Sequence, residues 1–207
     1  MTITDDLQRS WADELDYGSA SEEGVIRIIE MAKAAKLDIN ARSLYFDETP
    51  LHFVADRGYV KAGKILLSDS NIKVDAVSGD DGGTPLHNAA LGSWCDCPEM
   101  VKLLLDHGAN PNALDDENNT PLHMAARGDC VEAAEMLINK GANVNALNKE
   151  NKTALDLAIE YRACPKMMKL LARAEATAPV RIGQYSLTAK ALEPNVLLSV
   201  NSIRTRE

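Results

Sequence analysis

Histidine is the residue in this chain with the widest chemical range, because an imidazole can donate, accept, move a proton or bind a metal. Three of the four histidines, His52, His87 and His123, each follow the tripeptide Thr-Pro-Leu. Their separations, 87 − 52 = 35 and 123 − 87 = 36, place one histidine in each unit of a repeat. General acid–base catalysis needs groups within hydrogen-bonding reach of one substrate. The spacing therefore predicts a structural role, and His107, just before Gly108, fits the last turn of a helix.

The sequence lacks the short motifs that carry most cofactor and hydrolase chemistry. It contains no Gly-x-Gly-x-x-Gly, phosphate loop, His-Glu-x-x-His, Gly-x-Ser-x-Gly or Cys-x-x-Cys. We therefore expect a protein that is not an enzyme and that binds no cofactor.

One acidic segment has the start of a calcium-binding pattern. Asp115, Glu117 and Asn119 alternate as the first ligands of a calcium loop do. The sixth position is not glycine, however, and Ala126 occupies the twelfth position, where a glutamate belongs. The sequence therefore favours a solvated loop over a metal site.

The cysteines could bind a metal or form a redox pair. Aligned on the repeat, they lie in the loops between two helices: Cys95, Cys97, Cys130 and Cys164. A zinc ion needs sulfur atoms about 2.3 Å away, whereas successive units are spaced by about a helix diameter, on the order of 10 Å. The start of the chain also lacks a basic region followed by an apolar run, so reduced cysteines are expected. We expect free thiols packed beneath turns, with a metal or redox clip as the alternative.

The helices that position these side chains are read from the repeated phrase. A threonine oxygen can cap a helix start, and proline is favoured at the first helical position, so each Thr-Pro predicts a helix N-terminus. A fourth, altered copy begins at Thr153, and the spacings are 84 − 49 = 35, 120 − 84 = 36 and 153 − 120 = 33. Residues four apart share one helical face, and the pairs predicted to form the core are Leu51 with Ala55, Leu86 with Ala90, Leu122 with Ala126 and Leu155 with Ile159.

Three features in register make the chain resemble the ankyrin repeat family over about residues 20–172. They are the Thr-Pro-Leu-His phrase, a following leucine-rich helix, and the ending Gly-Ala-Asn-x-Asn-Ala at residues 108–113 and 141–146. The resemblance implies an all-α solenoid of stacked helix-turn-helix units with β-hairpin finger loops. It also implies that each repeated imidazole bonds to finger backbone and that the protein has a noncatalytic binding role.

This register divides the chain into a degenerate capping repeat, four full repeats and a tail. The first unit, with helices expected at 4–16 and about 25–32, ends at residue 41. We expect it to be a degenerate capping repeat, because a terminal repeat must keep its outer face polar. The tail spans 179–207, with a helix expected from Ser186 and an apolar stretch at 196–203 that caps the last repeat or binds an adaptor. The full repeats span about 42–76, 77–113, 114–146 and 147–178, and their fingers span 43–48, 78–83, 115–119 and 148–152.

Charge indicates the kind of partner. The formal net charge is −9, and the tail from Arg173 onward has five basic and three acidic residues, so the first 172 residues carry −9 − 2 = −11. Acidic residues on neighbouring finger tips repel phosphates, so nucleic acid is not expected as a ligand. No stretch has the roughly 20 apolar residues of a membrane helix. We expect a cytoplasmic monomer, with a nuclear or host-cytoplasmic location as alternatives, that binds a protein with a basic surface patch.

In the resembled family, partners bind the concave surface formed by the finger tips and the exposed sides of the first helices. Tyr45 and Phe46 are an aromatic pair at a finger tip, where they serve binding or cover the N-terminal cap. The second repeat has about three extra residues between its helices, within residues 93–97, and we expect this insertion to expose Trp94. The candidate binding residues are Tyr45, Phe46, Glu48, Asp56, Arg57, Asp80, Asp81, Leu91, Trp94, Asp116, Glu117, Asn119, Arg127, Lys149, Glu150, Lys152, Glu160 and Tyr161.

Two functions of different classes are compatible with these patterns. The first is a noncatalytic protein–protein interaction module, an adaptor, scaffold or inhibitor that binds its partner on the concave face. The alternative is a metal-binding or modifying protein in which the tail or the cysteine-lined loop edge is the active part. The absence of a catalytic motif favours the first.

Overall fold

A computed structural model describes residues 21–43, 47–92, 98–177, 179–182 and 185–188. No helix in these ranges is both long and apolar enough to cross a membrane. Two short strands, β1 (Pro179–Ile182) and β2 (Tyr185–Thr188), end the described chain. They are preceded by the helices α2 (Glu22–Ala34), α3 (Pro50–Asp56), α4 (Val60–Leu67), α5 (Pro85–Leu91), α6 (Pro98–Asp106), α7 (Pro121–Arg127), α8 (Val131–Asn139), α9 (Ala154–Glu160) and α10 (Pro165–Thr177).

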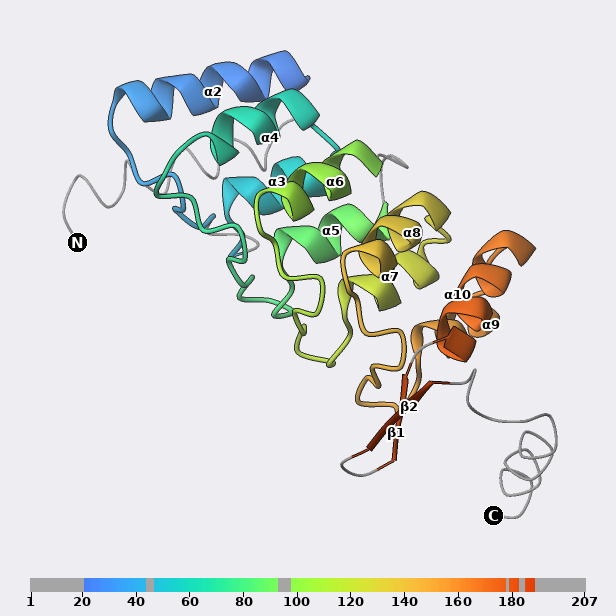
Figure 1. The fold of residues 1–207 in the computed structure, drawn as a ribbon. Coiled ribbons are helices and arrows are strands. Elements are labelled where there is room, and N and C mark those ends of the chain that lie inside the picture. The colour runs from blue at the N-terminus through green and yellow to red at the C-terminus, as the bar shows by residue number, and fades with distance from the viewer. Residues whose placement is uncertain (1–20, 44–46, 93–97, 178, 183–184, 189–207) are drawn as a thin grey trace, which may run out of the picture.

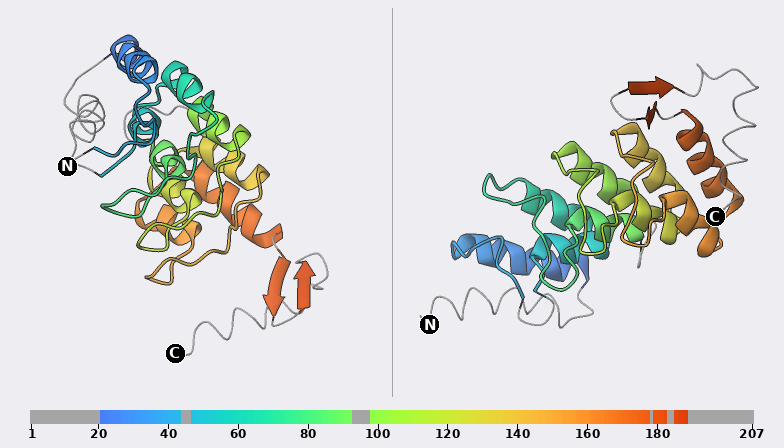
Figure 2. Two further views of the ribbon diagram at one scale, coloured as in Figure 1. Left: turned by 90° about the vertical axis from the view of Figure 1, so that its left-hand side faces the viewer. Right: turned by 90° about the horizontal axis from the view of Figure 1, so that it is seen from below.

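The helices form two stacked layers (Figure 1). The inner helices, α3, α5, α7 and α9, pack on one another in chain order, and the outer helices, α2, α4, α6, α8 and α10, do the same beside them. An inner helix and the outer helix that comes after it make one unit, and Figure 2 shows the units in succession with loops projecting from one end. This is the all-α solenoid that the sequence predicts. The helix expected at 4–16 lies outside the described residues.

Each Thr-Pro pair begins an inner helix, as predicted. Thr49, Thr84 and Thr120 are N-cap residues with extended backbone, and a proline follows each of them in the first turn. Thr153 caps α9 in the same way, although alanine replaces the proline there. The inner helices are only seven residues long, so packing rather than intrinsic helix propensity must stabilise them.

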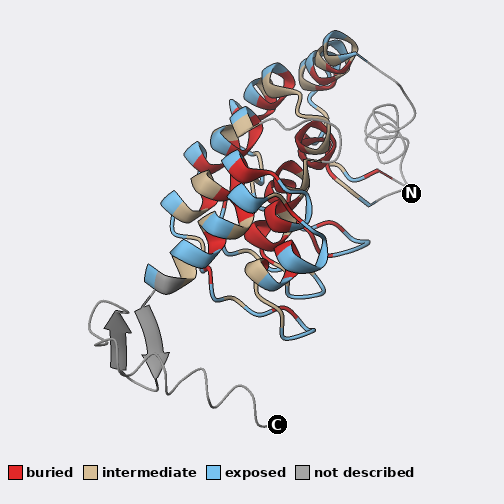
Figure 3. Ribbon diagram, turned by 90° about the vertical axis from the view of Figure 1, so that its right-hand side faces the viewer, coloured by how far each residue is buried: buried red, intermediate tan, exposed pale blue. Residues whose placement is uncertain are grey.

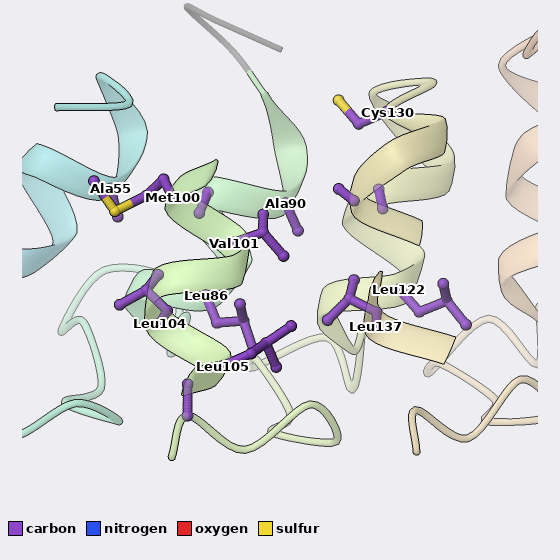
Figure 4. Packing of buried hydrophobic residues seen from close by; sticks show 14 of the residues in the cluster. Ala55, Leu86, Ala90, Met100, Val101, Leu104, Leu105, Leu122, Cys130 and Leu137 are labelled. Atoms are coloured by element: carbon purple, nitrogen blue, oxygen red, sulfur yellow. The ribbon is translucent and has the colours of Figure 1, made fainter. Parts of the chain in front are cut away.

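The core lies between the two layers and is mainly apolar. Figure 3 shows buried residues concentrated where the layers meet, and Figure 4 shows the core side chains of the middle units. Ala90 and Ala126 are fully buried, and these small side chains let α5 and α7 pack closely. One leucine from each helix of the first three full units is fully buried: Leu51, Leu66, Leu86, Leu104, Leu122 and Leu137.

The last unit departs from the predicted core. Leu155 is half-buried and Ile159 is 58% exposed, whereas Ala126, at the position that corresponds to Ile159, is fully buried. In earlier units the next inner helix covers this face, and α9 is the last inner helix of the described chain. The prediction that Ile159 belongs to the core is therefore wrong.

The fingers are loops in which the first residue donates a backbone hydrogen bond to the last, and their described residues form no strand. The expected hairpins are too short for a second rung of a ladder. The first two fingers are one residue longer than the last two, as predicted. The closing N–H to carbonyl bonds are Ser43 to Glu48 at 2.9 Å, Ser78 to Gly83 at 2.7 Å, Asp115 to Asn119 at 3.0 Å and Asn148 to Lys152 at 3.1 Å.

Backbone hydrogen bonds also tie each finger to the one before it. The bonds therefore hold successive fingers at a fixed spacing along the stack. They run from Gly79 N–H to Asp47 O at 3.2 Å, from Asp116 N–H to Asp81 O at 2.9 Å and from Lys149 N–H to Glu117 O at 2.9 Å.

The strands β1 and β2 form an antiparallel pair after α10. In its register Ile182 pairs with Tyr185, and Thr188 returns to pair with Pro179. The helix expected from Ser186 is therefore wrong for Ser186–Thr188, which lie in β2. Strand pairing with the β-branched residues of β1 outweighs the local cap signal of the serine.

Candidate functional site

The three repeated histidines connect each unit to the next finger. In each unit the imidazole Nδ1 accepts the backbone N–H of the capping threonine, at 3.2 Å in His52, 3.0 Å in His87 and 3.1 Å in His123. The opposite nitrogen, Nε2, then donates to a carbonyl of the following finger. These carbonyls belong to Gly83 at 3.2 Å, Asn119 at 3.1 Å and Lys152 at 3.1 Å.

Burial keeps these imidazoles neutral. It lowers the pKa of His52 to about 4, and it also lowers the pKa of His87 and of His123. In the fourth copy Asp156 replaces the histidine, and its carboxylate accepts the Thr153 N–H at 2.9 Å. Asp156 thus keeps the local cap, and no further finger comes after it within the described repeats.

Some predicted binding residues are used to build the fingers. The Asp81 carboxylate accepts hydrogen bonds from the Ser78 hydroxyl and, at 2.9 Å, from the Gly83 N–H. Burial acts to raise the pKa of Asp81, but these two hydrogen bonds outweigh it and lower the pKa. In the next finger Asp115 accepts the Asn119 N–H at 2.7 Å and the Asn119 Nδ2 group at 3.0 Å. The candidate calcium ligand Asp115 is therefore occupied by its own finger.

The inner face, formed by the fingers and the exposed sides of the inner helices, has a hollow of about 180 Å³ between the third and fourth full units. Met124 from α7 and Leu157 from α9 contribute its apolar lining. The Arg127 guanidinium lies over the Tyr161 ring, 5.4 Å from its centre. Six predicted binding residues line this hollow: Glu117, Asn119, Arg127, Glu150, Glu160 and Tyr161.

Ion pairs organise the rim of the hollow. Lys152 Nζ lies 2.6 Å from Glu150 and 2.7 Å from Glu160, and these hydrogen bonds, that to Glu150 first, raise the pKa of Lys152. Lys149 Nζ lies 3.7 Å from Glu117. The pairs are solvent-exposed, and such pairs contribute roughly 0–1 kcal/mol, so an incoming partner can exchange them at little cost.

The candidate residues of the first full unit pack against one another instead. The Arg57 guanidinium lies 5.3 Å from the centre of the Phe53 ring, and its Nε lies 3.9 Å from the Asp56 carboxylate. Burial raises the pKa of Asp56. Glu48 accepts a hydrogen bond from Asn88 Nδ2 of the next unit at 3.1 Å. These side chains therefore contact one another and the next unit.

The remaining candidates are separate from the hollow. Asp80 is exposed at a finger tip, and Leu91 is half-buried at the end of α5. Tyr45, Phe46 and Trp94 lie outside the described residues.

An exposed apolar row was missed by the sequence argument. Val77, Leu114 and Leu147 are 48%, 54% and 53% exposed, and each precedes the first residue of a finger. The signal was present, because each comes directly after the alanine that ends the exit turn of a unit. The described fold thus leaves these three aliphatic side chains about half exposed to solvent.

The described cysteines lie at the loop edge that the sequence predicts. Cys130 is buried at the N-cap of α8, and its thiol lies 3.5 Å from the Gly128 carbonyl oxygen. Cys164 precedes α10 and its backbone N–H donates to Asp129 at 2.9 Å. Neither of the two forms a disulfide with the other, and no group of three or more potential ligands in the described chain is placed to hold a metal ion. Cys95 and Cys97 lie outside the described residues.

The stacked helix pairs, the Thr-Pro helix starts and the imidazole-to-finger bonds define a repeat solenoid in which each unit contacts its neighbours. A family model described as ankyrin repeats (3 copies) matches residues 19–115 and 93–181. The chain belongs to the ankyrin repeat family.

Several curated proteins are similar over part of this chain. A rice protein, Zinc finger CCCH domain-containing protein 24 (Oryza sativa subsp. japonica), is 34% identical over 126 residues, covering 58% of this chain and 16% of that protein. Putative E3 ubiquitin-protein ligase XBAT34 of Arabidopsis thaliana is 54% identical over 67 residues, covering 32% and 17%. A putative ankyrin repeat protein of Rickettsia felis (strain ATCC VR-1525 / URRWXCal2) is 32% identical over 114 residues, covering 52% and 46%.

The chain spans less than a fifth of the two plant relatives and about half of the bacterial one. The likeness thus concerns only a part of each of these proteins. Ankyrin repeats are generally protein–protein interaction modules, and the family is generally non-enzymatic.

Proposed function

We propose that this protein is a noncatalytic adaptor, scaffold or inhibitor that holds a partner protein against its inner face. The observation that carries this proposal is the hollow in which Arg127 lies over the Tyr161 ring, 5.4 Å from its centre. Arginine and tyrosine are enriched among the residues that dominate binding energy, most of all beside a pocket that excludes water. Met124 and Leu157 supply the apolar surface that such a contact needs.

We propose that the protein acts as a monomer and that its partner presents basic side chains to this face. Glu117, Glu150 and Glu160 surround the hollow, and the exposed Asp80 and Asp116 extend the acidic surface along the fingers. The net charge of −9 adds a long-range attraction for a basic protein and a repulsion for nucleic acid. The apolar row of Val77, Leu114 and Leu147 would contact aliphatic side chains of the same partner.

A photo-crosslinking amino acid in place of Tyr161 tests the proposed face. Met31 is the matched control, because it is 72% exposed on the outer helix α2. We expect one partner to be captured from position 161 and not from position 31. Equal capture at both positions would move the interaction away from the inner face.

Affinity for the captured partner tests the residues themselves. Arg127→Ala and Tyr161→Ala should each weaken binding by about tenfold or more, since truncating a central contact costs on the order of 1–2 kcal/mol or more. Lys102→Ala, on the exposed side of α6, should leave the affinity unchanged. A matching loss for Lys102→Ala would indicate a different binding surface.

The metal-binding alternative gains no support from the described cysteines. Cys130 is buried and hydrogen-bonded, which suits packing beneath a turn. We propose that the cysteines are free thiols without bound metal. Elemental analysis of protein purified without chelator, combined with a thiol titration, measures this directly, and one equivalent of zinc retained through dialysis would restore the alternative.

A further inference from the structure

The last inner helix, α9, carries an aliphatic side chain on a face that the described chain leaves open. Ile159 is 58% exposed and its neighbour one turn earlier, Leu155, is half-buried. In the preceding unit the corresponding residues, Leu122 and Ala126, are fully buried. We attribute the exposure of Ile159 to a missing neighbour, because α9 is the only inner helix among the described residues that no further inner helix follows.

The residue types on this face indicate a cover that differs from a helix of the repeat. Inside the stack an alanine at this position lets the next inner helix approach closely, whereas Ile159 would hold it further away. The outer helix of the last unit, α10, has Lys169, Ala172 and Arg173 as exposed residues. This part of its surface is suited to contact with water. The uncovered apolar surface of the last unit is thus centred on α9.

The register of the β1–β2 pair determines where the remaining chain starts. Thr188 pairs with Pro179, which lies two residues after the last residue of α10, so the described chain ends close to the C-terminal end of α10. The helices α9 and α10 are antiparallel neighbours, and Ile159 lies about 20 Å from that end, from 1.5 Å of rise per residue and an interhelical distance of about 10 Å. Residues 189–195 can span about 23 Å when extended.

The segment after this connection is apolar. Residues 196–203 read Val-Leu-Leu-Ser-Val-Asn-Ser-Ile, with no charged side chain. Solenoids need their terminal units covered or polar. We propose that residues 196–203 pack on the open face of α9, over Leu155 and Ile159, and cap the C-terminal end of the stack.

A double-mutant cycle tests this cap in the full chain. Its four proteins are the wild type, Ile159→Gln, the chain truncated after Thr188, and the truncated chain with Ile159→Gln. We expect Ile159→Gln to reduce the hydrogen-exchange protection of α9 amides by about tenfold in the full chain and to have no further effect after truncation. The same effect in both backgrounds would overturn the proposal.

Met31→Gln provides the matched control at the other end of the stack. Met31 is 72% exposed on α2, so its effect should be the same with and without residues 189–207. If α9 protection rises with protein concentration and survives the truncation, a second copy rather than the tail covers this face, and the proposal is wrong.

A second measurement serves if the truncated chain unfolds. A photo-crosslinking residue at position 159 of the full chain should form an intramolecular link that peptide mapping places within 189–207. Mapping to another region of the chain, or to a second copy, would contradict the proposed cap. This test involves no partner protein, so it is independent of the function proposed for the inner face.

Discussion

At the scale of single residues, the repeated histidine connects the start of its own helix to the next finger. A neutral imidazole accepts on one ring nitrogen and donates from the other. In His123 the acceptor holds the threonine amide of its own helix and the donor reaches a carbonyl of the next finger. Protonation would turn the acceptor into a second donor facing that amide. This pair of hydrogen bonds therefore requires a neutral histidine.

This requirement predicts a loss of stability in mild acid. The pKa of histidine in an unfolded chain is about 6.5, whereas burial lowers the pKa of His52 to about 4 and lowers those of His87 and His123. As the pH falls, the unfolded chain binds protons first. The free energy of unfolding is therefore greatest above about pH 6.5 and falls by up to about 1.4 kcal/mol per pH unit for each histidine.

Urea unfolding at several pH values between about 7.5 and 5 measures this slope. His52→Gln should reduce the slope, because it removes one of the three buried imidazoles whose pKa is lowered. A free energy of unfolding that stays constant across this range would show that the histidines are not neutral connectors.

At the scale of elements, the third finger depends on a polar side chain at its base. Asp115 accepts the backbone amides of Glu117 at 2.9 Å and Asn119 at 2.7 Å, whereas the next residue, Asp116, is exposed. Asp115→Ala should lower the free energy of unfolding by about 1–3 kcal/mol, because it removes the acceptor of several hydrogen bonds. Asp116→Ala should change it by no more than about 0.5 kcal/mol. Chemical denaturation compares them, and equal effects would contradict this account.

Two leucines of the third full unit differ sharply in burial. Leu122 is fully buried and Leu114 is 54% exposed. Leu122→Ala should cost about 2–5 kcal/mol of stability, and Leu114→Ala should cost less than about 0.5 kcal/mol. The two variants delete the same atoms, so their difference in denaturant midpoint reports burial alone. Similar midpoints would mean that the apolar row is covered.

The helix starts and the structural role of the histidines could be predicted from the sequence, because the same phrase recurs in several repeats. Thr-Pro marks each N-terminus locally, and three copies of one phrase confirm the register. The exposure of Ile159 could not be predicted in this way, since it depends on whether another inner helix packs on α9 rather than on any neighbouring residue. The internal use of Asp81 was hidden for a related reason, because its carboxylate is satisfied by the folding of its own loop.

The hollow could be predicted only in part, because it depends both on the local sequence pattern and on how two units pack. The repeat register placed Arg127 and Tyr161 at exposed positions at the ends of two inner helices, and that much could be predicted. Their stacking, and the meeting of Glu117 with Lys149, depend on how closely two units approach. A single sequence carries little information on that distance.

At the scale of the whole molecule, charge should control how fast a basic partner arrives. Asp80, Asp116 and Glu117 are exposed along two fingers, whereas Asp81 is excluded because its carboxylate holds its own loop. Reversing the three exposed acids to lysine should mainly slow association and remove its salt dependence, because exposed charges are screened over about 8 Å at physiological ionic strength. Truncating Tyr161 should mainly speed dissociation.

Surface plasmon resonance with the captured partner separates these two effects. Thermal melting of the charge-reversed variant shows whether its fold is intact. An association rate that is unchanged across salt concentrations in the wild type, together with full binding by the variant, would place the contact elsewhere.

The bonds that join one unit to the next have a mechanical consequence. Each junction consists of the same few hydrogen bonds and a strip of apolar contact, so a chain pulled by its two ends should yield unit by unit. Each step would release the 33 to 36 residues between successive threonines, or about 120 Å of extended chain. Optical tweezers would record a staircase of equal extensions, and a single rupture of the full length would show that the units act as one.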